Sequence, residues 1–276
     1  MIRLANALEE AGHVSPGQTW QALTGGRTNR LWRVQEHVVK LFAPTKNPLF
    51  PNEPDAEWAI LNELDGLGVT PRPVHSGSWD GCRYIVYEFQ YGHAWEQGGS
   101  QPAGVLRRVH RVSAQNDYRS APDGSSALVD QTNGILNVLD ASVRDRLLLL
   151  RPDGVVAPSV RRSLLHGDPV PANFIIGDAP VLVDWQCPAI GDPVEDLCLF
   201  LSPAMQLAYR GAPLEADEIQ DFLAEYDCTE TAKRLALLAP WHHWRMAAYC
   251  AWKSATDPIY AQGIGLELAA LNQVSR

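Results

Sequence analysis

The sequence predicts an α+β protein of two lobes, in which a small antiparallel sheet precedes a larger, mainly helical part. Short strand-like runs separated by turn residues occupy residues 1–90, whereas apolar residues at helical spacing dominate residues 91–276. A hydrophobic content of 46% with 20% charged residues supports a sizeable core and argues against a disordered chain. We expect a linker at about residues 88–92 to join the two lobes.

The first lobe is predicted as five strands with one inserted helix, preceded by a short amphipathic helix. Its turns are marked by a glycine-containing segment at 25–29 and by Asp-Gly at 80–81, which is typical of a tight hairpin. The inserted helix has apolar residues at helical spacing and is closed by glycine. In chain order we expect a helix at 2–11, strands at 20–24, 30–34 and 38–42, a helix at 55–67, and strands at 73–79 and 83–89.

The second lobe is predicted to be helical apart from one β-hairpin. Two short apolar runs at 174–176 and 181–183 flank a turn of Gly, Asp, Ala and Pro, which indicates paired strands. The remaining apolar residues recur at helical spacing. We expect helices at 105–115, 132–150, 194–207, 216–226, 229–253 and 258–274, with loops at 116–131 and 151–160.

Charge and cysteine content exclude several classes of function. The formal net charge is −9 and the chain has no basic run, which argues against nucleic acid or an anionic membrane surface as a partner. The five cysteines are widely spaced without a C-x-x-C pair, which fits free thiols in a reducing compartment. Residues 1–15 lack the pattern of a signal peptide, and no apolar run is long enough to span a bilayer. We therefore expect a soluble, cytoplasmic protein.

The segment around the predicted hairpin carries the clearest chemical signal. Asp168 and Asn173 lie in a proline-containing loop before the first hairpin strand, and Asp184 follows the second strand. Because antiparallel pairing brings these strand ends together, Asn173 and Asp184 should converge. Their oxygen donors suit Mg²⁺, and a carboxylate without metal, such as Asp168, can accept a hydroxyl proton. Each residue alone is typical of a turn or strand end, whereas the three in this order indicate a site.

This segment resembles the aminoglycoside phosphotransferase and choline kinase-like family of small-molecule kinases, which is related in fold to protein kinases. Members of that family carry H-x-D-x-x-x-x-N, a hairpin and D-[WF]-[ED]; the present chain has His166, Asp168, Asn173 and Asp184 at the matching positions. The resemblance implies a protein-kinase-like bilobal fold and transfer of the γ-phosphoryl group of ATP, with GTP also open, to a hydroxyl group with Mg²⁺. Gln186 departs from the pattern, where the family usually has an acid.

The resemblance also assigns expected nucleotide contacts in the first lobe. The family has a glycine-containing loop between its first two strands, a lysine in the third strand and a carboxylate in the inserted helix. Glu57 is preferred to Glu53 because Pro54 places Glu53 at or before the helix start. The last strand leads into a linker whose main-chain groups would bond the adenine edge. The residues at these positions are Gly25, Gly26, Thr28, Asn29, Lys40, Glu57, Glu88 and Gln90.

The phosphoryl acceptor is the least defined part of the prediction. Asp192 could cap the following helix or face the substrate. Trp244 and Trp252 share one helical face, which could form an acceptor pocket or pack in the core. An aromatic face and a net charge of −9 favour a cationic alcohol of choline or thiamine type, although an aminoglycoside or amino sugar also fits the family. The segment after Asp184 is too short for an activation loop, so we expect a small-molecule acceptor.

A second reading remains, in which the chain is a catalytically silent nucleotide-binding module of the same fold. Such modules often lack one member of the catalytic set. The four positions occupied by Lys40, Asp168, Asn173 and Asp184 are all intact here, which favours an enzyme.

Overall fold

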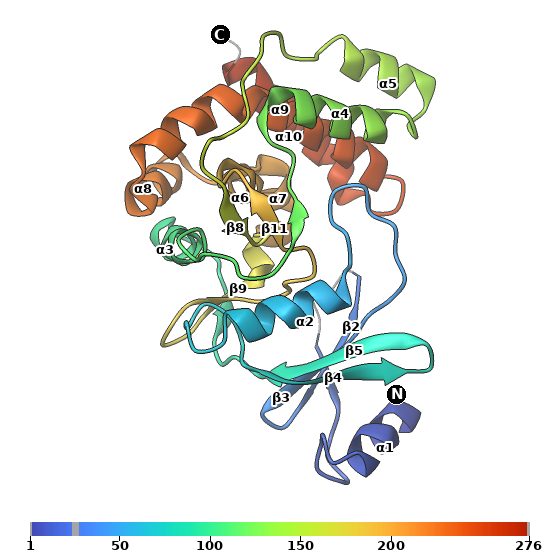
Figure 1. Cartoon of the computed structure of the whole chain (residues 1–276). Helices are drawn as coiled ribbons and strands as arrows, with labels where there is room; N and C mark the ends of the chain where they lie inside the picture. Colours follow the sequence, from blue (N-terminus) through green and yellow to red (C-terminus); the bar gives the residue numbers. More distant parts are fainter. Residues whose placement is uncertain (1, 24–27, 275–276) are drawn as a thin grey trace.

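The structure is a computed structural model that describes residues 2–23 and 28–274. It confirms the predicted α+β class, with an antiparallel sheet in the N-terminal part and a mainly helical C-terminal part (Figure 1). Helix α2 (Pro54–Glu63) lies between the sheet and the helical lobe. Within the described residues, no helix has the length and apolar character needed to cross a membrane.

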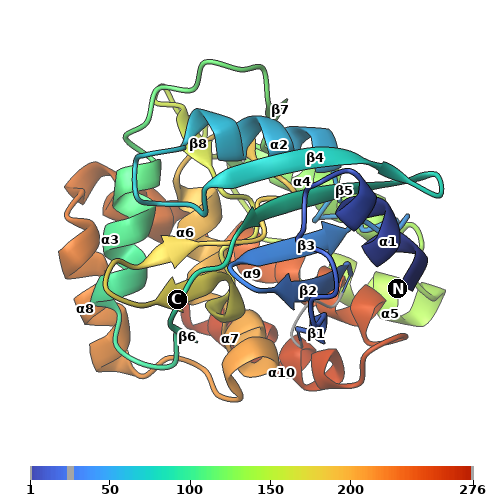
Figure 2. The same cartoon turned by 90° about the horizontal axis from the view of Figure 1, so that it is seen from below.

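The N-terminal sheet has five antiparallel strands in the order β1-β2-β3-β5-β4. Alternation along its central strands sends Val39 and Val86 to one face, where they pack against α1 (Ile2–Glu10), and Val38 and Ile85 to the opposite face, which packs near α2 (Figure 2). Lys40 shares the α2 face because it is two residues from Val38. The strands are β1 (Gln21–Ala22), β2 (Arg30–Val34), β3 (His37–Leu41), β4 (Pro73–Trp79) and β5 (Cys82–Glu88).

Three predicted helices have different boundaries in the structure. The helix expected at 132–150 is two helices, α4 (Gly124–Leu136) and α5 (Ala141–Leu148), and α4 begins inside the expected loop at 116–131. The helix expected at 194–207 is α6 (Val194–Leu201) and α7 (Pro203–Arg210). The break at Ser202 has a clear cause, because its side chain accepts from the Met205 N–H as an N-cap and Pro203 cannot donate to a preceding turn.

The third difference is α3, which spans Ser100–Val109 instead of 105–115. The helix has His110 as its C-cap, and the ring of His110 bonds Asp196 and Tyr226 in the core. The helices that complete the lobe follow the expected boundaries closely. They are α8 (Ala216–Tyr226), α9 (Thr229–Lys253) and α10 (Ile259–Val274).

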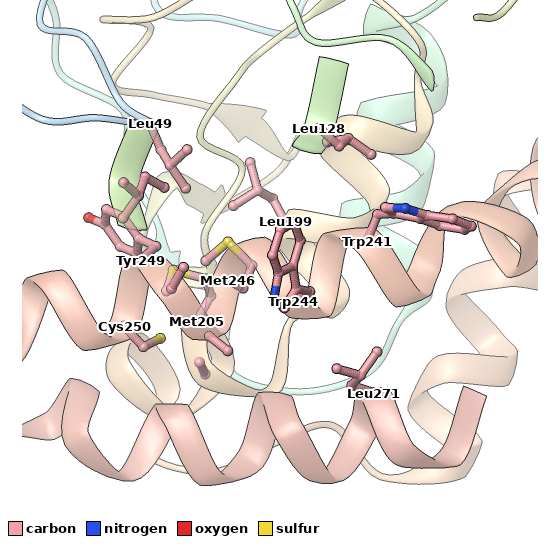
Figure 3. Packing of buried hydrophobic residues seen from close by; sticks show 14 of the residues in the cluster. Leu49, Leu128, Leu199, Met205, Trp241, Trp244, Met246, Tyr249, Cys250 and Leu271 are labelled. Carbon is pink, nitrogen blue, oxygen red and sulfur yellow. The ribbon is translucent and has the colours of Figure 1, made fainter. Parts of the chain in front are cut away.

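The core of the helical lobe lies around α9, which packs against α4 and α10 (Figure 1). Trp244 is fully buried there and donates its indole N–H to the Leu147 carbonyl at 2.7 Å. Figure 3 shows its ring beside Leu199 and Met246. A tryptophan whose single donor is satisfied can occupy a core without an unpaired polar group.

Short strands position the segment that contains Asp168, Asn173 and Asp184. The predicted hairpin forms from β9 (Phe174–Ile176) and β10 (Val181–Leu182), and β6 (His93–Ala94) extends it. A second small sheet has the order β7-β11-β8. Its members are β7 (Arg119–Ser120), β8 (Ser163–Leu165) and β11 (Ala189–Gly191). Strands β8 and β11 of this second sheet pair with each other and so fix both ends of residues 166–188, and the hairpin lies within that segment.

Candidate active site between the lobes

Lys40 is the central cation of the site. Its side chain is fully buried, with Nζ 2.5 Å from Glu57 Oε2 and in a second short contact with Asp184 Oδ1. Burial alone would lower the pKa of Lys40, but the two carboxylates outweigh this effect and raise it above its ordinary value. Lys40 therefore carries a fixed positive charge that links the sheet, α2 and the hairpin end.

Asp168 lies in the loop after β8 and is 6% exposed. Burial raises its pKa well above the ordinary value, and the nearby charges of Asp184 and Asp196 act in the same direction. Asn173 supports the loop by donating from Nδ2 to the Asp168 carbonyl at 2.9 Å. A buried carboxylate with a raised pKa is a suitable acceptor for a hydroxyl proton.

The ends of the hairpin meet as the sequence predicts. The Val183 N–H donates to the Asn173 carbonyl at 2.9 Å, so Asp184 follows directly beside Asn173. Asp184 has a positive φ of 64°, an unfavourable backbone conformation for a residue other than glycine. Its side chain keeps 30% exposure, which leaves the carboxylate accessible from the cleft.

Asp196, at the start of α6, braces the loop that carries Asp168. It is fully buried and accepts from the backbone N–H groups of His166 at 2.7 Å and Gly167 at 2.9 Å, and from the His110 ring at 3.1 Å. Burial tends to raise the pKa of Asp196, but these hydrogen bonds, led by that of His110, hold it below the ordinary value. The carboxylate thus remains ionised and fixes the loop backbone.

A pocket joins these residues to a wall of aromatic side chains. Asp168, Asn173 and Asp184 lie on its floor, and Gln186 and Thr28 also line it. The rest of its lining comes from the loop after β8, from the segment before α2, from α7 and from the ends of α9 and α10. These residues are Asn47, Phe50, Val170, Tyr209, Tyr249, Lys253 and Tyr260.

The donor set is suited to Mg²⁺. Asn173 uses its Nδ2 toward Asp168, so its Oδ1 remains an acceptor, and Asp184 offers a carboxylate beside it. Among the described residues no group of three or more His, Cys, Asp or Glu has the arrangement of a metal site. Two oxygen ligands fit Mg²⁺, which is usually held by one or two carboxylates together with phosphates and water.

The residues expected to contact the nucleotide differ in where they lie. Gly25 and Gly26 lie outside the described residues. Thr28 lines the pocket, whereas Asn29 is buried and hydrogen-bonded to neighbouring amide side chains. Glu88, at the end of β5, donates its N–H to the Arg72 carbonyl, and its own carbonyl accepts from the Gln90 side chain at 3.4 Å. The adenine contacts of Glu88 and Gln90 stay predictions.

The residues expected to contact the acceptor do not line the pocket that contains Asp168. Asp192 is buried, contacts the Arg234 guanidinium and accepts from the N–H of Val194, the first residue of α6, at 3.1 Å. Trp244 is in the core described above. Trp252 lines a separate shallow pocket beside residues 45–48. Of the two alternatives that the sequence left open, Trp244 follows the second and packs in the core. Helix α9 lines the pocket through Tyr249 and Lys253.

Sequence reasoning missed Tyr249, Lys253, Tyr209, Tyr260 and Asn47. Tyr249 and Lys253 are four residues apart and so share a helical face, which is the one signal that could have indicated them. Hydrophobic periodicity does not show which of several helix faces of mixed polarity borders a pocket. Asn47 donates from Nδ2 to the Tyr249 hydroxyl at 3.2 Å, a contact between lobes that no local pattern predicts.

Comparison with known proteins agrees with this geometry. Residues 19–238 match the model of the phosphotransferase enzyme family. A search of curated protein sequences gives no match.

Solved structures of similar fold include several small-molecule kinases. A choline/ethanolamine kinase family protein from Mesorhizobium loti has a TM-score of 0.69 at 16% identity, covering 99% of this chain and 93% of that one. The choline kinase LicA from Streptococcus pneumoniae has a TM-score of 0.68 at 18% identity, covering 98% and 99%. The GDP and kanamycin complex of the aminoglycoside phosphotransferase APH(2")-IIIa has a TM-score of 0.67 at 16% identity, covering 99% of both chains.

Proposed function

Because this chain belongs to the phosphotransferase enzyme family and is a small-molecule kinase, we propose that it transfers the γ-phosphoryl group of ATP to a hydroxyl group with the help of Mg²⁺. The observation that carries this proposal is that Asp168, Asn173 and Asp184 line one pocket, with the buried Lys40 paired to Asp184 behind it. GTP is a second candidate donor, since a similar fold has been solved with GDP.

Each residue has a defined part in the proposed reaction. Mg²⁺, when bound by Asp184 and Asn173, would neutralise charge on the phosphates. Lys40 steadies the phosphates and is itself oriented by Glu57. Asp168 accepts a hydrogen bond from the acceptor hydroxyl, aligns its oxygen with the phosphorus and takes up the proton as the new bond forms. Such catalysis consists mainly of positioning and charge stabilisation.

We further propose that the acceptor is a small cationic alcohol. Tyr209, Tyr249, Tyr260 and Phe50 supply aromatic rings around the pocket in which Asp168 lies. Aromatic rings attract organic cations by about 0.5–2 kcal/mol each, and the protein has a net charge of −9. Choline-like, thiamine-like and amino-sugar acceptors all meet this description, and proteins of similar fold carry the names of choline and aminoglycoside kinases.

A panel assay tests the function directly. Release of ADP should be measured with choline, thiamine, amino sugars, aminoglycosides and homoserine, with and without Mg²⁺, for the unmodified chain and for Asp168→Asn. Turnover that depends on one acceptor, on Mg²⁺ and on Asp168 supports the proposal. Nucleotide binding without turnover across a broad alcohol panel would instead favour the catalytically silent module.

A further inference from the structure

A cluster of three neutral amide side chains connects the glycine-containing loop to the predicted metal ligand. Asn29 follows the loop, Asn52 precedes α2, and Gln186 lies two residues after Asp184. Asn29 Nδ2 donates to Asn52 Oδ1 at 2.9 Å and to Gln186 Oε1 at 3.1 Å. Asn29 and Gln186 are 8% and 5% exposed, so the bond between them is shielded from water and stronger for it, whereas the bond to Asn52 is partly buried.

The cluster residues also make hydrogen bonds with the backbone N–H groups of Ala43 and Glu53. Asn29 Oδ1 accepts from the Ala43 N–H at 3.1 Å and from Asn52 Nδ2 at 2.8 Å. The Gln186 carbonyl accepts at 2.9 Å from the N–H of Glu53, the residue that precedes α2. The cluster therefore joins several chain segments. One of them is the start of α2, the helix that carries Glu57.

Gln186 closes one end of a strained segment. Asp184 has a φ of 64°, and a non-glycine residue in this conformation costs about 1–2 kcal/mol. Such a conformation persists only where its neighbours are fixed. Val183 is fixed by Asn173 and by His166 Nε2, which lies 3.0 Å from its carbonyl. Gln186 is fixed by Glu53 and Asn29.

We propose that the Asn29–Asn52–Gln186 cluster is a positioning device that holds Asp184 in the conformation in which it would bind Mg²⁺ and connects it to Asn29, the last residue of the 25–29 segment. This inference rests on the proposed function. It also explains the unusual residue at 186. A glutamine can accept from Asn29 without adding a third carboxylate to Asp168 and Asp184, and its engaged Oε1 is directed at Asn29 instead of at the metal.

Calorimetry with the non-hydrolysable analogue AMP-PNP tests the proposal, with the ratio of affinities measured with and without Mg²⁺ as the readout. Gln186→Met keeps the size of the side chain and removes the acceptor, and Asn52→Ala weakens the cluster from the other lobe. Losing a buried hydrogen bond of about 1 kcal/mol should lower the affinity ratio about fivefold. Gln186→Glu retains the acceptor and should keep at least the unmodified ratio.

Gln206→Met is the matched control. Gln206 is fully buried, donates to the Phe200 carbonyl at 2.6 Å and lies outside the pocket, so its loss reports only on folding stability. An unchanged ratio in Gln186→Met and Asn52→Ala would overturn the proposal, as would a loss in Gln186→Glu equal to that in Gln186→Met. An unmodified chain that binds no nucleotide would overturn the proposed function itself, which is a distinguishable result.

Discussion

At the scale of single residues, the catalytic role proposed for Asp168 conflicts with stability. Its carboxylate is buried beside two other carboxylates, and its raised pKa records the cost of keeping it charged. The unfolded chain would ionise this group near pH 4, so stability is lost as pH rises from there through the folded pKa. A neutral group of the same shape avoids this loss.

We therefore expect Asp168→Asn to lower kcat by about 10²–10⁴ while raising the stability of the chelator-treated protein. The gain in melting temperature should be larger at pH 8 than at pH 5. Steady-state kinetics and thermal unfolding at both pH values check this, with nucleotide affinity as the control for an intact site. A variant with near-normal kcat would exclude Asp168 as the proton acceptor.

Asp196 has the opposite electrostatic balance. Its pKa is held below the ordinary value, so it contributes stability above the unfolded pKa of about 4, and this contribution disappears as pH falls through the folded pKa. Asp196→Asn should lose about 1–3 kcal/mol at pH 7 because one loop N–H loses its partner. Denaturant unfolding should show this difference narrowing below pH 4. A difference independent of pH would contradict the assignment.

At the scale of elements, α9 has two faces with different tasks. Trp244 faces the core, whereas Tyr249 borders both the core and the pocket and accepts from Asn47. The face of an amphipathic helix that packs inward is determined by its neighbours, here α4 and α10. This is why periodicity located the helix correctly but left open whether its tryptophans line a pocket or pack in the core.

Trp244→Ala should accordingly lower the free energy of unfolding by about 3–5 kcal/mol through the cavity it leaves. The KM for the acceptor in the folded fraction should stay unchanged. Lys253→Met is the contrasting change, because it alters the pocket without touching the core, and it should change the acceptor KM more than the KM for ATP. Unfolding curves and initial rates distinguish the two. A selective rise in acceptor KM for Trp244→Ala would restore the original prediction.

At the scale of the whole molecule, the site is a junction between lobes. Lys40 comes from the sheet, Asp184 from the hairpin of the helical lobe, and Asn47 reaches across to Tyr249. A ligand that contacts both sides stabilises the folded chain as a unit. At 100 times its dissociation constant, Mg²⁺ with AMP-PNP should add about 2.7 kcal/mol.

Differential scanning calorimetry checks this expectation, and the gain should disappear with EDTA or in Asp184→Ala, which removes the carboxylate ligand. Asp184→Ala should remain folded in the absence of Mg²⁺ and AMP-PNP. If Mg²⁺ with AMP-PNP stabilised Asp184→Ala as much as the unmodified chain, Asp184 would not be a metal ligand.

The sequence by itself determined the α+β class and the hairpin, because period-2 alternation and turn residues are local, and strand pairing then predicted that Asn173 and Asp184 converge. Lys40 entered the predicted site through the family resemblance, and within that resemblance a single proline decided for Glu57 over Glu53. Only the tertiary structure decided the break at Ser202, the burial of Trp244, the contact of Asp192 with Arg234 and the amide cluster at Gln186. Each of these depends on which distant segment packs against the residue, and such contacts between positions far apart in the chain leave no periodic trace in the sequence.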